Sequence, residues 1–233
     1  MSPLRRDPYQ RLGGAVLHNT SRLARHVLCA VLLASASETV CPFTITISNG
    51  PPRTVYLQVG VGGFIGYYNA GGTPGNNATV NQESVSVAAA AVGNATAQAM
   101  TTDSTVGASS YDGFVRCNVA AQLYIGGFYR TPGLGATGSA TVTATVPAAL
   151  VDAGGDTLSF ARISWTTGGN GPTGSTPTQP FPAGTFTAGA VQTVGAIAQN
   201  QWAESCWTFS YGNTTIPAAG TYTGRVLYTL TAP

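Results

Sequence analysis

The sequence is poor in charge and lacks one basic side chain altogether. Only 8% of its 233 residues are charged, no lysine occurs, and the only histidines are His18 and His26. Ser-His-Asp and Cys-His catalysis, Schiff-base lysines and histidine-containing metal sites all depend on these side chains. The chain beyond residue 36 therefore excludes these chemistries, and we expect neither an enzyme nor a cofactor or metal site.

Carboxylates are also few, and they are scattered. Asp152 and Asp156 are close in sequence, but they flank Gly154-Gly155 and are typical of a turn, whereas a glycosidase needs two acids positioned across a cleft. Beyond Ala36 there are five arginines and seven carboxylates, which gives a net charge of −2. Without a basic patch to hold a phosphate backbone, nucleic acid is excluded as a partner.

The first 36 residues have the pattern of a secretory signal peptide. Arg22 and Arg25 precede the apolar run Val27–Leu33, and Ala34-Ser35-Ala36 forms a small-x-small cleavage site. The run is too short to span a bilayer. We expect residues 1–36 to be cleaved and residues 37–233 to fold as one domain that meets a membrane only during export. A short buried helix in a cytosolic protein is the alternative.

The clearest strand pattern lies near the C-terminus, at Gly220–Leu230. Tyr222, Val226, Tyr228 and Leu230 share one parity, and three threonines and Arg225 share the other, with Leu227 as the one apolar residue among them. Side chains alternate between the two faces of a strand, so this pattern predicts a strand with one buried and one wet face.

Shorter alternating runs recur along the chain between glycine- and proline-rich turns. They lie at Cys41–Ile47, Val55–Val59, Phe114–Tyr124, Ala140–Val146 and Trp207–Tyr211, and residues 166–184 form a long Gly/Pro-rich stretch that predicts an exposed loop. This spacing is typical of a single all-β sandwich of about eight to ten short antiparallel strands.

Three cysteines remain after the predicted cleavage: Cys41, Cys117 and Cys206. Export makes a disulfide plausible. Cys41 and Cys117 lie on the apolar faces of their predicted strands, whereas Cys206 has the parity opposite to Trp207. Parity therefore favours a Cys41–Cys117 bridge, and the two pairings with Cys206 remain open.

Four aromatic residues are candidates for ligand stacking. Tyr67 and Tyr68 fall in a glycine-rich stretch, and Trp165 and Trp202 lie in or near predicted strands. They would serve an alternative function, that of a monomeric carbohydrate- or surface-binding module. For Tyr67 and Tyr68, core filling or a place at a sheet edge is the other interpretation.

The C-terminal pattern also resembles a known family. Residues 216–230 read Ile-Pro-Ala-Ala-Gly-Thr-Tyr-Thr-Gly-Arg-Val-Leu-Tyr-Thr-Leu, which is similar to the last strand of bacterial spore coat U-like and fimbrial-subunit proteins. Cys41, soon after the cleavage site, and the run Phe114–Gly126 are similar to their two cysteine strands. The resemblance implies an incomplete immunoglobulin-like sandwich, exported to the periplasm and assembled by a chaperone and an usher, in which each subunit receives a strand from a neighbour.

Two features depart from that family. The separation of Cys41 and Cys117 is longer than usual, and only Ser37–Val40 precede the first cysteine, so Cys41–Ile47 would have to be both donated arm and strand. The combined expectation is a secreted structural or adhesive protein of the bacterial periplasm or cell surface. Its partners would be copies of itself or a periplasmic chaperone and usher, and its assembly strand would carry Tyr222, Val226, Tyr228 and Leu230.

Overall fold

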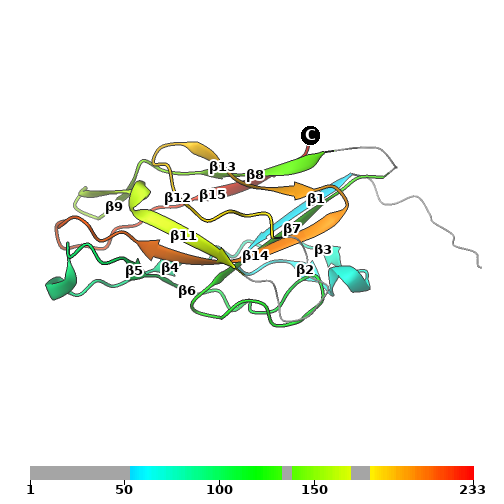
Figure 1. The fold of residues 1–233 in the computed structure, drawn as a ribbon, viewed down its shortest axis with the longest axis horizontal. Coiled ribbons are helices and arrows are strands. Elements are labelled where there is room, and N and C mark those ends of the chain that lie inside the picture. Colours follow the sequence, from blue (N-terminus) through cyan, green and yellow to red (C-terminus); the bar gives the residue numbers. More distant parts are fainter. Residues whose placement is uncertain (1–52, 133–137, 169–178) are drawn as a thin grey trace, which may run out of the picture. The chain divides into compact units, whose positions relative to one another are not determined.

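The structure is a computed structural model that describes residues 53–132, 138–168 and 179–233. The described chain is all-β, with antiparallel sheets and only three-residue 3₁₀ turns as helical elements (Figure 1). The elements are β1 (Thr54–Val59), β2 (Phe64–Ile65), η1 (Tyr68–Ala70), β3 (Thr73–Pro74), β4 (Glu83–Ser84), η2 (Ala89–Ala91), β5 (Gln98–Ala99), β6 (Thr101–Thr102), β7 (Leu123–Arg130), β8 (Ser139–Thr145), β9 (Ala149–Val151), β10 (Thr157–Ser159), η3 (Phe160–Arg162), β11 (Ile163–Gly168), β12 (Gly184–Thr185), β13 (Val191–Ala198), β14 (Gln201–Tyr211) and β15 (Leu227–Thr231).

The main sheet is organised around β14. Its strand order is β1-β7-β14-β11-β12, and β5 also pairs with β14 where β7 has ended. A second sheet has the order β13-β8-β15, and short two-stranded pairs form between β9 and β10, β2 and β3, and β4 and β6. All of these pairings are antiparallel.

One hydrophobic core joins the two larger sheets. The main sheet contributes Ile125, Trp165 and Trp207, and the second sheet contributes Val142 and Val194. The indoles of Trp165 and Trp207 stack with centroids 5.0 Å apart and planes within 4°. Aromatic side chains of this size remove a large apolar area from water, so this stack is the centre of the packing.

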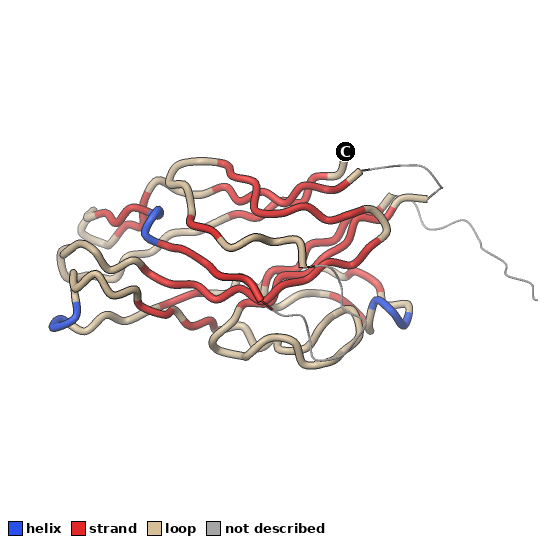
Figure 2. Tube along the Cα trace, viewed as in Figure 1, coloured by secondary structure: helices blue, strands red, loops and turns tan. Residues whose placement is uncertain are grey.

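β7 and β14 are buried on both faces. The reason is that parts of the segment between β1 and β7, which carries only two-residue strands and long loops, lie along the other face of the main sheet (Figure 2), while Val85, Val87 and Met100 of this segment pack against the main core. Tyr56, Phe128 and Trp202 pack there against Phe64 and Tyr68. We call the segment 60–122 the loop layer.

Two predicted elements differ from the structure. The predicted strand 114–124 is mostly irregular, because a turn at Asn118–Gln122 with Ala120 at φ 67° interrupts it, and the regular strand starts only at Leu123. Of the predicted exposed loop 166–184, Thr166–Gly168 belong to β11, Phe181 is buried, and Gly184 begins β12. Residues 169–178, like the predicted strand Cys41–Ile47 and the predicted signal peptide, lie outside the described residues.

Candidate functional site

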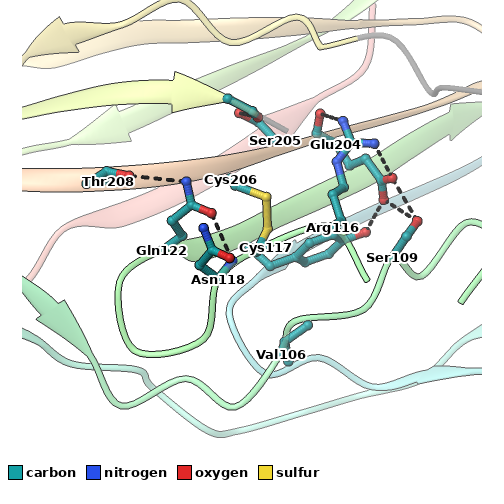
Figure 3. Close-up of a disulfide and its surroundings, with 12 residues drawn as sticks. Val106, Ser109, Arg116, Cys117, Asn118, Gln122, Glu204, Ser205, Cys206 and Thr208 are labelled. Atoms are coloured by element: carbon teal, nitrogen blue, oxygen red, sulfur yellow. Dashed lines mark hydrogen bonds and ion pairs between the residues drawn. A yellow bond between two sulfur atoms is a disulfide. The ribbon is translucent and has the colours of Figure 1, made fainter. Parts of the chain in front are cut away.

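A buried carboxylate lies between the main sheet and the loop layer. Glu204 of β14 is fully buried, and its oxygens lie 2.7 and 2.8 Å from the Ser109 hydroxyl, which donates to the carboxylate (Figure 3). Arg116 forms an ion pair with it at 2.7 Å and donates to the Glu204 main-chain carbonyl at 3.0 Å. The Tyr124 hydroxyl donates at 2.5 Å and the Trp202 indole N–H at 2.9 Å.

Local sequence explains how these donors converge. Trp202, Glu204 and Cys206 alternate with Ala203 and Trp207 along β14, so the first three face the loop layer. Glu204 is paired in register with Gly126 of β7, where a side chain would collide with the Tyr124 phenol. The glycine thus allows the phenol to reach the carboxylate.

A disulfide reinforces the same contact. Cys117 of the loop layer is bonded to Cys206 of β14, next to Arg116 and Glu204 (Figure 3). The predicted Cys41–Cys117 bridge is therefore wrong. Parity failed because Cys206 faces the loop layer, and that second face of β14 is as buried as the core face.

This cluster is suited to holding two layers together. Four side chains donate to one carboxylate, and burial together with the charge of Glu204 raises the pKa of Tyr124 well above its usual value. A carboxylate that accepts four donors in a closed interior has no free lone pair or open side for a substrate. Among the described residues, no group of three or more acidic, histidine or cysteine side chains could hold a metal ion.

The four aromatic candidates are not gathered in one site. Trp165 is buried in the core, Trp202 is buried under the loop layer, and Tyr68 packs in the same cluster beneath the Arg130 guanidinium. Only Tyr67 is exposed, at 47%, with its ring against Gly113. The expected stacking role is contradicted for Trp165 and Trp202, because a ligand cannot reach a buried ring.

The predicted C-terminal strand is present in shortened form as β15. Tyr228 and Leu230 are half-buried against the core, and Leu227, Thr229 and Thr231 are exposed. Val226 continues the core-facing row just before β15. Tyr222 has the same partly buried parity but lies in the preceding turn, where its hydroxyl donates to the Ala218 carbonyl at 2.8 Å.

Among the described residues, β15 pairs with one neighbouring strand, β8. The Val146 N–H, directly after β8, donates to the Ala190 carbonyl at 2.9 Å, so even-numbered residues of β8 turn toward β13. The odd-numbered residues of β8 must then turn toward β15, where Thr143 is paired with Thr229.

It follows that Val226, Tyr228 and Leu230 turn their main-chain N–H and C=O groups away from β8. In the described part of the chain, no strand pairs with this second edge of β15. β1 lies alongside it, and Arg53 donates to the Pro233 carbonyl at 2.8 Å, which closes the end of the edge nearest the C-terminus.

Leu150, Leu158 and Ala188 are only partly buried against the core. Along this edge of β15 the flanking side chains are likewise only partly buried. These are Leu57 and Val59 of β1, Val85 and Val87 after β4, and Val226, Tyr228 and Leu230. We call this row, together with the free backbone groups of β15, the β15 seam.

Glu83 lies at the β15 seam. Its Oε1 atom is buried without a hydrogen-bond partner. Burial raises the pKa of Glu83 from its usual value near 4.5 to about 7, a hydrogen bond from Thr102 opposes the rise, and the Asp103 charge adds to it. Burial, and then the charge of Glu83, also raise the pKa of Tyr228.

Comparison of the chain with protein-family models, with curated proteins and with solved structures finds no match. Within residues 53–132, 138–168 and 179–233, no helix is long and apolar enough to cross a membrane. The geometry of the seam and of the buried cluster therefore carries the functional argument.

Proposed function

We propose that this chain is a secreted structural or adhesive protein of the bacterial periplasm or cell surface, with an immunoglobulin-like sandwich that assembles through its C-terminal strand. The observation that carries the proposal is the β15 seam. Its main-chain groups are unpaired among the described residues, and apolar side chains lie incompletely covered beside them. An extended segment added to such an edge gains main-chain hydrogen bonds and covers alternate side chains.

The remaining polar chemistry supports contact rather than catalysis. The one ion pair among the described residues is buried between two layers. A disulfide beside it suits an oxidising compartment. The partner at the seam would be an extended segment of a second copy, or of a periplasmic chaperone that holds the edge before assembly.

The test is a pair of substitutions at one position of β15. Leu230→Pro removes the N–H that faces the free edge, whereas Leu230→Ala truncates the same side chain and keeps that N–H. Both variants leave the bonds from β8 to Leu227, Thr229 and Thr231 intact. Association is measured by size-exclusion chromatography with light scattering, and folding by circular dichroism.

We expect wild type and Leu230→Ala to form oligomers and Leu230→Pro to stay monomeric while folded. A wild-type chain that remains monomeric at high concentration, alone and with its periplasmic chaperone, would end the proposal. So would a Leu230→Pro variant that associates as wild type does.

A further inference from the structure

The segment 83–87 is joined to the main sheet where β7 has ended. β5 and the Met100 N–H bond to β14, and β4 pairs with β6, which directly follows Met100. Side chains alternate along this extended segment, because Glu83, Val85 and Val87 are partly buried and the residues between them are exposed. A carboxyl group therefore lies in the same inward-facing row as two valines that pack against the core. We call residues 83–87 the flap.

The flap is fixed firmly on both sides and held weakly in between. On one side, Asp103 accepts hydrogen bonds from the Asn81 side chain at 2.8 Å and from the Gln82 N–H at 2.9 Å. On the other side, the Asn213 side chain donates to the Ala91 carbonyl at 2.7 Å. Between these points, the flap is held by the two-residue pairing of β4 with β6 and by the apolar contacts of its two valines. Such a segment can lift off the core while the sheets stay folded.

The Glu83 carboxyl is the weak point of the closed flap, because its Oε1 atom is buried without a hydrogen-bond partner. The titratable groups that face it are Asp103, directly after β6, and Tyr228 of β15, and neither is a cation. Hydrogen bonds from Asn81 and Gln82 lower the pKa of Asp103, and burial raises the pKa of Tyr228. An ionised Glu83 in the closed flap thus has an unsolvated oxygen and a negative neighbour, and exposure to water relieves both.

We propose that ionisation of Glu83 opens the flap and exposes the β15 seam to a partner strand. This inference rests on the proposed function and adds the regulation of the same site. A protonated Glu83 keeps Val85 and Val87 against the core at the seam. When Glu83 releases its proton to water and turns outward, the two valines move with it, because the three side chains share one face of one extended segment. Association through β15 is then suppressed in an acidic medium and permitted as the medium becomes neutral or alkaline.

The inference is tested on the full chain by hydrogen exchange, measured by mass spectrometry at about pH 5 and about pH 8. Glu83→Gln keeps the shape of the side chain and stays neutral. Asp156→Asn is the matched control, since it removes a carboxylate from an exposed turn. The exchange rate of the flap in each protein is divided by the rate in Glu83→Gln at the same pH, because intrinsic exchange also accelerates with pH. Light scattering on the same samples measures association.

For wild type and Asp156→Asn, we expect this ratio to rise roughly tenfold between the two pH values, while the peptide that contains β8 remains protected. Wild type should also associate more at the higher pH, and Glu83→Gln should associate weakly at both. The inference is overturned if the ratio does not change with pH. It is also overturned if the flap opens and wild type associates equally at both pH values. A flap that opens in a chain that stays monomeric at both would support the pH response and refute the proposed function instead.

Discussion

The half-buried carboxyl of Glu83 makes a quantitative prediction about pH. Its pKa is raised from about 4.5 to about 7 mainly by burial, so the folded state binds this proton more tightly than the unfolded chain does. The contribution of Glu83 to the free energy of unfolding is therefore fully present below about pH 4.5. It falls as the pH rises through about 7 and no longer changes above about pH 8. The full shift corresponds to about 3 kcal/mol, and solvent screening of a partly exposed group reduces this to about 1–2 kcal/mol.

Glu83→Gln isolates this effect, because glutamine has a similar shape and stays neutral. Between about pH 4.5 and about pH 8.5, wild type should lose roughly 0.5–1 M more in its urea midpoint than Glu83→Gln does. Asp156→Asn is the control, since it removes a carboxylate from an exposed turn and should keep the wild-type slope. Equal slopes for wild type and Glu83→Gln would refute the argument from burial.

Three further predictions concern the contacts that hold the layers and the seam. Arg116→Met should lower the free energy of unfolding, measured by chemical denaturation, by about 3 kcal/mol. This value is at the low end for a broken buried ion pair, because the Glu204 carboxylate keeps three other donors. A decrease below about 1 kcal/mol would contradict the paired geometry. Replacing Cys117 and Cys206 together by alanine should lower the free energy of unfolding by about 4–5 kcal/mol, as expected for a bridge with a separation of 89 residues, and differential scanning calorimetry measures it. Arg53→Ala removes the hydrogen bond that closes the end of the β15 edge, so light scattering should show faster association than in wild type. Slower association would contradict this prediction and show that the bond stabilises the edge for assembly.

The period-2 pattern predicted much of the sheet structure. Alternation in Ala140–Val146 and in Val226–Leu230 places the same residues against the core in the structure. It did so because these strands have one covered and one open face, the condition under which alternation carries information.

The same pattern failed in two other places. Phe114–Tyr124 alternates too, yet Phe114, Val115 and Val119 are exposed, and the segment is held by a disulfide and by the Arg116 ion pair instead of by a strand ladder. Nothing in the sequence states that a loop layer covers the second face of β14, so the parity of Cys206 was misleading. A signal for the buried cluster was present in Glu204, the one charged residue of the run Gln201–Tyr211, which requires a cationic partner if both faces are buried.

The central position of β14 has a consequence for how the chain is made. This strand, residues 201–211, lies between β7 and β11 and also pairs with β5. Three segments that precede it in the sequence therefore cannot complete their pairing until it has been made. A ribosome releases the N-terminal part first, and about two hundred residues emerge before the strand that unites them. We therefore expect the main sheet to close only after β14 has been synthesised.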